Sequence, residues 1–165
     1  MNDQAYFAAP LDILRDSVRE EWLDYNGHMN VAYYVLVLDR ATDIFMDAIG
    51  VDALYRQQEK GSLFALEQHV IYRDEVRSGD PLRVTTQLVD HDDKRVHYFH
   101  RMYHGERGYL AATGEFLSIH VDLAARRSRP FPPVITGRIE RMAASHATLG
   151  TPEEVGRSVA IRRKR

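Results

Sequence analysis

The sequence predicts an α+β fold in which one antiparallel β-sheet curves around a single central helix. Three observations lead to this expectation. The segment 31–49 has the pattern of a helix whose first half is apolar on every side. One strand-like run precedes this helix, and four β-rich runs with turn signals between them follow it. A helix without a polar face has to be enclosed by other structure, and the strands supply the enclosure.

The central helix has clear signals at both ends. Asn30 suits the N-cap position, because its side chain can accept a hydrogen bond from a free backbone N–H group of the first turn. Gly50 suits the residue that ends a helix in a left-handed conformation. Between them, residues 31–38 read VAYYVLVL, and polar residues gather only from Asp39 onward. The helix is therefore expected to span Val31–Ile49, with its first turns buried.

The strands follow from β-rich runs separated by turn-forming residues. Rough alternation over Ile13–Trp22 predicts a first strand before the helix. After the helix, an antiparallel meander is predicted over Ser62–Arg73, Leu82–Asp90, Arg95–Tyr103 and Tyr109–Val121. The turns between successive strands of this meander are short enough for hairpins or near-hairpins. The order of one strand, a buried helix and four long strands describes the hot-dog architecture.

A single domain accounts for most of the 165 residues, a length that suits one hydrophobic core. We expect an N-terminal leader over residues 1–12, a hot-dog domain over 13–145 and a mobile basic tail over 146–165. The segment RRSRPFPP that starts at Arg126 cannot continue a sheet, because its prolines lack a donor. A short helix is expected near Ile135–Ala144.

The composition limits the classes of function. Lys and Arg number 22 against 24 Asp and Glu, so a net charge of -2 provides no global field that favours nucleic acid or a membrane surface. The absence of cysteine excludes disulfides, thiolate metal sites and a cysteine nucleophile. The N-terminus has no long apolar core, and the longest apolar run, Val31–Leu38, is far below the roughly 20 residues of a membrane helix. We expect a cytoplasmic protein with neither nucleic acid nor membrane as a partner.

The loop that leads into the helix concentrates chemical groups. It carries the carboxylate of Asp24, the imidazole of His28 and the amide of Asn30. A helix N-terminus offers unpaired N–H groups and the positive end of the dipole, which suit a carbonyl oxygen that gains charge during thioester cleavage. The amide of Val31 or a neighbour is the expected donor. Asp24 could attack the thioester carbon or deprotonate a water, and its alternative role is that of a turn-forming residue.

The remaining loop residues have structural as well as functional interpretations. His28 could orient the substrate or the carboxylate, or it could form a structural hydrogen bond. Asn30 caps the helix and could also fix the Asp24 loop. Gly27 permits a positive φ or a close approach of the backbone to a ligand, and an ordinary turn requires the same geometry.

The run Asp24-Tyr25-Asn26-Gly27-His28-Met29-Asn30 resembles the active-site entry of hot-dog acyl-CoA thioesterases of the 4-hydroxybenzoyl-CoA thioesterase type. The resemblance extends from about Val18 to Pro133 and includes Ser78-Gly79-Asp80 and Thr113-Gly114-Glu115. It implies that Asp24 is catalytic, that the backbone donor belongs to Val31, and that the site lies at a subunit interface. Within the superfamily, these blocks resemble the betainyl-CoA thioesterases of carnitine metabolism. The pair Met29-Asn30 departs from the more frequent Val-Asn and leaves the acyl group open.

The implied substrate adds two sets of candidate residues. A quaternary ammonium group binds to aromatic faces, and the phosphates of CoA require cations near the pocket mouth. Glu67 and His69 share one face of the strand from Ser62 and could approach the helix or a partner's ligand. Each candidate also has an ordinary alternative as core packing, cross-strand pairing or a solvated turn charge. The aromatic candidates are Trp22, Tyr25, Tyr33, Tyr34, Phe64 and Tyr98, and the cationic ones are Arg73, Lys94, Arg95, Arg126 and Arg127.

The motifs that the sequence lacks favour hydrolysis with water alone. The histidines follow strand alternation and turns, without an HExxH or a compact ligand set, so we expect no metal. The sequence has no GxSxG elbow and no nucleotide-binding glycine loop, so we expect no cofactor beyond water. The alternatives are a hot-dog hydratase or dehydratase and a non-catalytic acyl-CoA-binding domain. Because a curved sheet leaves strand edges and part of the helix uncovered, we expect a homodimer or homotetramer.

Overall fold

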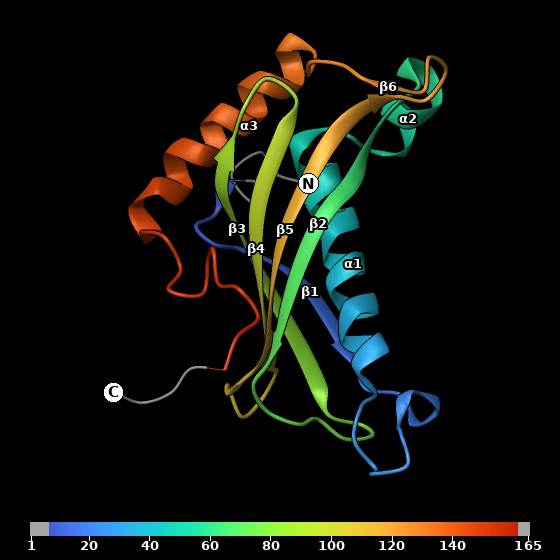
Figure 1. Ribbon diagram of the computed structural model, residues 1–165, viewed down its shortest axis with the longest axis vertical. Helices are drawn as coiled ribbons and strands as arrows, with labels where there is room; N and C mark the ends of the chain where they lie inside the picture. Colours follow the sequence, from blue (N-terminus) through green and yellow to red (C-terminus); the bar gives the residue numbers. More distant parts are fainter. Residues whose placement is uncertain (1–6, 162–165) are drawn as a thin grey trace.

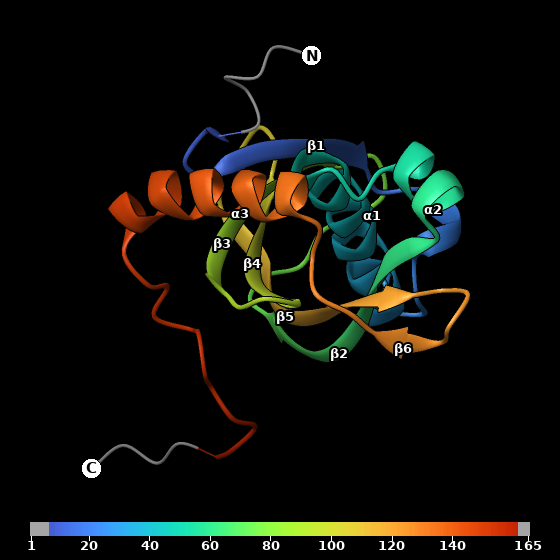
Figure 2. The ribbon, with the colours of Figure 1, turned by 90° about the horizontal axis from the view of Figure 1, so that it is seen from above.

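The computed structural model describes residues 7–161 and contains one antiparallel sheet curved around a central helix (Figure 1). The strands pair in the order β1-β3-β4-β5-β2, with the short β6 paired to β5. Seen from above, the sheet curls around α1, with β1 on one side and β2 on the other (Figure 2). The predicted fold class is confirmed. The strand bounds are β1 Leu11–Ser17, β2 Gly61–Tyr72, β3 Pro81–His91, β4 Arg95–His104, β5 Leu110–Asp122 and β6 Arg127–Ser128.

The central helix α1 spans Val31–Ile49, as the sequence predicts. The side chain of Asn30 accepts a hydrogen bond from the N–H group of Ala32 at 3.0 Å, and Gly50 ends the helix with φ 95°. Val37, Leu38 and Phe45 are completely buried against the sheet. A helix of this length is about 28 Å long, so its two ends lie at opposite ends of the molecule.

The first strand is shorter than predicted. β1 begins at Leu11, inside the predicted leader, and ends at Ser17. A 3-10 turn follows at Glu20–Trp22, because the chain bends there to bury the Trp22 ring, which is 3% exposed. The other part of the leader described here, residues 7–10, precedes the sheet, and residues 1–6 lie outside the described residues.

Two further elements were not expected from the sequence. Helix α2, Ala53–Glu59, follows α1 closely and is capped by Asp52, whose carboxylate accepts the Tyr55 N–H at 2.8 Å. Strand β6 pairs with Val121 and Asp122 of β5. The expectation that this segment cannot continue a sheet is therefore wrong for Arg127 and Ser128, which precede the prolines.

The C-terminal part of the chain packs on the sheet through a helix and then through the segment that follows it. Helix α3, Pro133–His146, lies along β3 and buries Ile135, Ile139 and Met142. After a 3-10 turn at Ala147–Leu149, the chain returns to the sheet. There the Gln87 side chain donates to the Gly150 carbonyl at 2.7 Å, and Arg73 pairs with Glu154 at 2.8 Å. These contacts lie within the predicted tail, whose mobility stays a prediction, and residues 162–165 lie outside the described residues.

No helix within residues 7–161 combines the length and the apolar character needed to cross a membrane.

Candidate functional site

The Asp24 loop forms a tight turn just before α1. The Asp24 N–H donates to the His28 carbonyl at 2.9 Å, and the Gly27 N–H donates to the Asp24 carbonyl at 3.0 Å. Gly27 has φ 77°, which explains the glycine. One carboxylate oxygen of Asp24, Oδ1, accepts the Asn26 N–H at 2.8 Å. Asp24 is thus a turn-forming residue, and its other oxygen, Oδ2, has no hydrogen-bond partner within residues 7–161.

The start of α1 offers one free backbone donor beside this turn. The Ala32 N–H is bonded to the Asn30 side chain, and the Tyr33 N–H donates to the Asn30 carbonyl at 2.9 Å. The Val31 N–H has no acceptor among the described residues, and Val31 is 57% exposed. The first turn therefore presents an unsatisfied N–H at Val31, the position that the sequence predicted for the donor.

The loop is fixed to its surroundings on two sides. The Asn30 N–H donates to the Trp22 carbonyl at 2.9 Å, and the Met29 N–H donates to the Val76 carbonyl at 2.9 Å. His28 Nε2 lies 3.0 Å from a carboxylate oxygen of Glu75. The segment between β2 and β3 thus contacts the turn through both backbone and side chain.

A polar cavity of about 350 Å³ opens in this segment, next to the residues that contact His28. It brings two arginines to the Asp24 end of the molecule, where cations could meet the phosphates of an acyl-CoA. Burial and the nearby carboxylates of Asp80 and Asp74 raise the pKa of the Tyr109 hydroxyl in its wall. The lining residues are Asp74, Glu75, Arg77, Asp80, Arg107 and Tyr109.

The aromatic candidates divide into buried and exposed residues. Trp22 stacks on Tyr33 with ring centroids 5.3 Å apart, and the guanidinium of Arg19 lies 4.9 Å from the centroid of the Trp22 ring. Tyr34 is 4% exposed, donates its hydroxyl to the Asp74 carbonyl at 3.2 Å, and has its pKa raised to about 12 by burial. Tyr98 is completely buried. For these three residues the structure favours the packing alternative.

Two exposed tyrosines remain near the start of α1. Tyr25 is 97% exposed at the tip of the Asp24 turn. Tyr72, at the end of β2, is 46% exposed, and its hydroxyl approaches the Val31 carbonyl at 3.4 Å. Burial of part of its surface raises the pKa of that hydroxyl. The sequence analysis did not single out Tyr72.

Most predicted phosphate-binding cations lie away from Asp24 in the same subunit. Lys94 and Arg95 flank the β3–β4 turn, at the end of the sheet opposite the α1 N-terminus (Figure 1). Arg95 is paired there with Asp92 at 2.6 Å. Phe64, Arg126 and Arg127 line a cavity of about 370 Å³ at this same far end. Only Arg73 lies at the Asp24 end, where it is engaged with Glu154.

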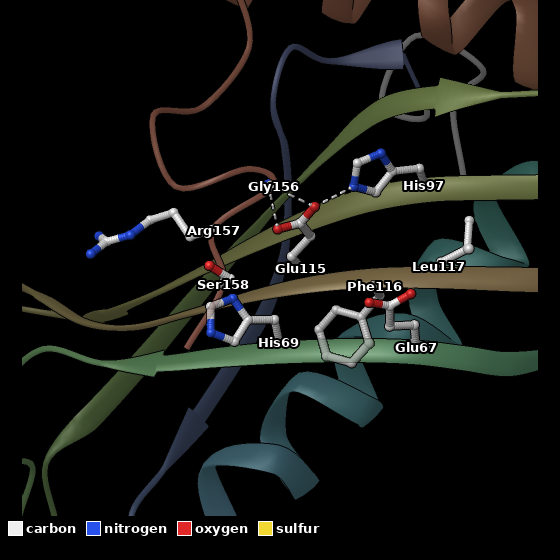
Figure 3. Close-up of a pocket in the computed structure, with 9 residues that line it drawn as sticks. All are labelled: Glu67, His69, His97, Glu115, Phe116, Leu117, Gly156, Arg157 and Ser158. Atoms are coloured by element: carbon white, nitrogen blue, oxygen red, sulfur yellow. Dashed lines mark hydrogen bonds and ion pairs between the residues drawn. The ribbon is translucent and has the colours of Figure 1, made fainter. Parts of the chain in front are cut away.

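Glu67 and His69 lie on the sheet face that points away from α1. They pair with Leu117 and Glu115 of β5, whereas the intervening Phe116 points inward and stacks on Tyr98. Together with the tail they line a cavity of about 370 Å³, in which Glu115 accepts bonds from His97 and the Gly156 N–H (Figure 3). Neither residue approaches the start of α1 in its own subunit.

Most of the residues that sequence reasoning missed come from one part of the chain. Tyr72 ends β2 and Glu75 and Arg77 follow it, whereas Arg107 lies in the β4–β5 turn. An antiparallel strand after a helix returns the chain toward the helix start, so the loop after the predicted strand at Ser62–Arg73 was the signal that could have identified them.

The profile of the Thioesterase-like superfamily matches residues 18–139. The chain belongs to this superfamily. It is 42% identical over 144 residues to a betainyl-CoA thioesterase of Pseudomonas aeruginosa, covering 87% of this chain and 91% of the relative. It is 38% identical over 157 residues to an L-carnitine dehydrogenase/betainyl-CoA thioesterase of Ruegeria pomeroyi, covering 95% of this chain and 32% of that longer protein.

The structure is similar to that of a Staphylococcus aureus protein solved in complex with CoA. The TM-score is 0.84 at 31% sequence identity, and the match covers 90% of this chain and 94% of the other. The prediction that this chain is an acyl-CoA thioesterase, a hydrolase of thioesters, is thereby confirmed. The roles of individual site residues stay predictions.

Proposed function

We propose that this thioesterase hydrolyses a small acyl-CoA, with betainyl-CoA as the preferred substrate, and that Asp24 carries the reaction. The observation that supports the catalytic proposal is that the loop carries a half-free carboxylate, at Asp24, and ends in an unsatisfied N–H, at Val31. A thioester carbonyl needs such a donor for its developing charge and a carboxylate on the side of its carbon.

The two possible roles of Asp24 use the same geometry. As a nucleophile, Oδ2 forms a bond to the thioester carbon, the C–S bond breaks, and the CoA thiolate leaves before water hydrolyses the mixed anhydride. As a general base, Asp24 takes a proton from a water that attacks the carbon, and the same C–S bond breaks. In both routes the Val31 N–H stabilises the oxyanion and the products are free acid and CoA. His28 and Asn30 hold the loop in place.

The identity of the acyl group is proposed from the relatives and from two exposed aromatic rings. The similar proteins of Pseudomonas aeruginosa and Ruegeria pomeroyi carry the name betainyl-CoA thioesterase. A trimethylammonium group binds to aromatic faces, and Tyr25 and Tyr72 expose theirs beside the α1 N-terminus. The alternatives from the sequence, a hot-dog hydratase or dehydratase and a non-catalytic acyl-CoA-binding domain, become outcomes of the test below. The cytoplasmic location and the independence from metals stay predictions.

We infer that the working unit is a homodimer, or a homotetramer built from it, joined through β2. This strand is at the edge of the sheet, and its residues 64–68 are all exposed, including Phe64 and Leu66, each at 54%. An open edge with apolar side chains favours pairing with another copy. A two-fold antiparallel pairing centred on this stretch would bring the partner's far end, with its phosphate-binding candidates, toward Asp24.

The first test measures release of free thiol from betainyl-CoA, short aliphatic acyl-CoAs and aromatic acyl-CoAs. Asp24→Asn should lower kcat by about 10²- to 10⁴-fold while thermal unfolding stays unchanged. Glu140→Gln is the matched carboxylate-to-amide control, because Glu140 is exposed on α3, which packs on β3 away from the β2 edge. Near-normal turnover by Asp24→Asn would refute the mechanism. Hydration of an enoyl-CoA without thiol release would support the hydratase, and CoA-dependent stabilisation without turnover would support the binding domain.

The second test concerns the oligomer. Leu66→Lys should convert the assembly to a smaller species in light scattering coupled to size exclusion, because it places a charge on the proposed β2 interface. Val134→Lys is the control, since Val134 is 72% exposed on α3. An unchanged mass for Leu66→Lys would contradict the β2 interface.

A further inference from the structure

The segment that follows α3 crosses the outer face of the sheet, which is the face that points away from α1. Seen from above, the red part of the chain lies outside the sheet, on the side opposite α1 (Figure 2). We call residues 150–158 the strap. Three side chains of the sheet region hold it. They are Gln87 with the Gly150 carbonyl at 2.7 Å, Arg73 with Glu154 at 2.8 Å, and Glu115 with the Gly156 N–H at 3.0 Å.

Glu115 is the anchor nearest the end of the strap. Both of its carboxylate oxygens accept the Gly156 N–H, and Oε1 also accepts a hydrogen bond from His97 Nε2 at 2.8 Å (Figure 3). The Glu115 side chain is 17% exposed, and hydrogen bonds to an ionised acceptor are stronger than bonds between neutral groups. Gly156 has φ 74°, which favours glycine at this point of the strap.

Side chains of the outer face are buried where the strap crosses it. Phe99 and Thr113 are each 1% exposed. Their neighbours face the helix, since Tyr98 stacks on a ring of α1 and Gly114 lies close to a leucine of the same helix. Because side chains alternate along a strand, Phe99 and Thr113 point to the outer face. Helix α1 therefore does not cover them, and the strap passes over this part of the sheet.

Without the strap, this face would offer an aromatic ring to a second copy of the chain. Two sheets that pack face to face lie about 10 Å apart, and a peptide segment across one face fills that space. We propose that the strap, held by Glu115, keeps the outer face of the sheet from packing on the outer face of a second copy. Assembly is then limited to other surfaces, such as the β2 edge. A closed strap is also the opposite of the mobile tail predicted for these residues.

Thr113 offers a reporter for the strap. It lies between two anchors, because Glu115 is two residues after it and Ala111, two residues before it, accepts the Arg73 N–H. Its Oγ1 is buried without a hydrogen-bond partner among the described residues. The chain has no cysteine, so Thr113→Cys introduces a single thiol beneath the strap and breaks none of the hydrogen bonds described. A thiol-reactive reagent should label this position only while the strap is open.

Two variants in the Thr113→Cys background release the strap from opposite sides. Glu115→Ala removes the acceptor. Gly156→Pro removes the N–H, and its fixed negative φ cannot match 74°, while the sheet itself is unchanged. Each should raise the labelling rate by about 10- to 100-fold, because each removes a hydrogen bond to a charged group. Glu106→Ala, an exposed glutamate in the β4–β5 turn, is the control and should label slowly.

The labelling has two outcomes that would overturn the proposal. Labelling of Thr113→Cys alone at the rate seen in the variants would mean that the strap is not closed. Unchanged rates in both variants would mean that Glu115 does not hold it. Gly156→Pro lies outside the sheet, so the test stands even where Glu115→Ala does not fold.

The second measurement is the mass of Glu115→Ala and Gly156→Pro, without the reporter, by light scattering coupled to size exclusion over a range of protein concentrations. Both should form a concentration-dependent species of about twice the wild-type mass, because a face that pairs with itself joins two assemblies about a two-fold axis. Wild-type mass in variants whose strap is open would refute the proposal. The comparison is with the wild-type mass, so it is independent of the outcomes for Asp24→Asn and Leu66→Lys.

Discussion

His100 Nδ1 and Thr86 Oγ1 are joined by a hydrogen bond of 2.7 Å in the interior between the sheet and α1. On the other side of the ring, Nε2 lies 3.1 Å from the hydroxyl of Thr42, which itself donates to the Leu38 carbonyl. Because that hydroxyl proton is already used, His100 Nε2 is the donor and Nδ1 accepts from Thr86. Both nitrogens are thereby satisfied only in the neutral imidazole.

The first prediction follows from this arrangement. Burial lowers the pKa of His100 to about 3, so the unfolded chain, with a pKa of 6.5, binds more protons between these values. The stabilisation by neutral His100 is full above pH 6.5 and is lost as the pH falls. Between pH 7 and pH 5 this group alone should cost about 2 kcal/mol of unfolding free energy.

Urea unfolding at the two pH values checks this expectation. His100→Asn should show a smaller loss of stability on acidification than the wild type. The comparison between the two proteins is needed because burial lowers the pKa of His120 and His146 in the same direction. Equal losses in both proteins would contradict the assignment to His100.

The second prediction concerns the close approach of β5 to the helix at Gly114. A Cβ added there would lie 2.5 Å from a ring carbon of Phe116 and 2.8 Å from Leu38 Cδ1. Gly114→Ala should therefore lower the unfolding free energy by about 1–3 kcal/mol through overpacking. Gly137→Ala is the control, because a Cβ in that turn of α3 meets no atom within 4 Å, and it should stabilise by up to about 1 kcal/mol. An unchanged unfolding free energy in Gly114→Ala would show that Phe116 and Leu38 move to accommodate the added methyl group.

The third prediction separates capping from catalysis. Asn30 caps α1 by accepting a backbone N–H at 3.0 Å, and Asp52 caps α2 by accepting one at 2.8 Å. Replacement of either by Ala should cost about 1 kcal/mol of unfolding free energy. Only Asn30→Ala should also lower kcat, because the Asn30 side chain fixes the first turn of α1 where it follows the Asp24 loop. Equal activity of the two variants in thiol release would argue that Asn30 has no role beyond its cap.

The sequence predicted the elements whose signals are local. Asn30 and Gly50 mark the ends of α1 because capping and the left-handed terminus depend on single residues. The four later strands agree with the structure to within one residue at each end, since periodicity and turns define them. Trp22 was assigned to a strand because its burial depends on Tyr33, a contact that alternation does not reveal.

The site was predictable only where it is contiguous in the chain. The turn from Asp24 to Asn30 could be read directly, because the hydrogen bonds that close it, from Asp24 to His28 and from Gly27 to Asp24, join residues close in sequence. Glu75 and Arg77 join it from a distance of about fifty residues, and their charges are unremarkable in a polar loop. Glu67 and His69 were placed on one strand face correctly, but alternation does not say which face meets the helix. The β-bulge between Ala65 and Glu67 adds a shift in register that no local signal marks.

The fourth prediction tests the acyl group through the two exposed tyrosines near α1. If Tyr25 and Tyr72 contact a trimethylammonium group, each ring contributes about 0.5–2 kcal/mol, so replacement by Leu should lower kcat/KM for betainyl-CoA by roughly 2- to 30-fold. The matched substrate is 3,3-dimethylbutyryl-CoA, in which carbon replaces the charged nitrogen at nearly the same volume. Because a neutral tert-butyl group has no cation–π attraction, the variants should affect it much less. Equal losses on both substrates would mean that the tyrosines act through shape, and the preference for a cationic acyl group would then need another source.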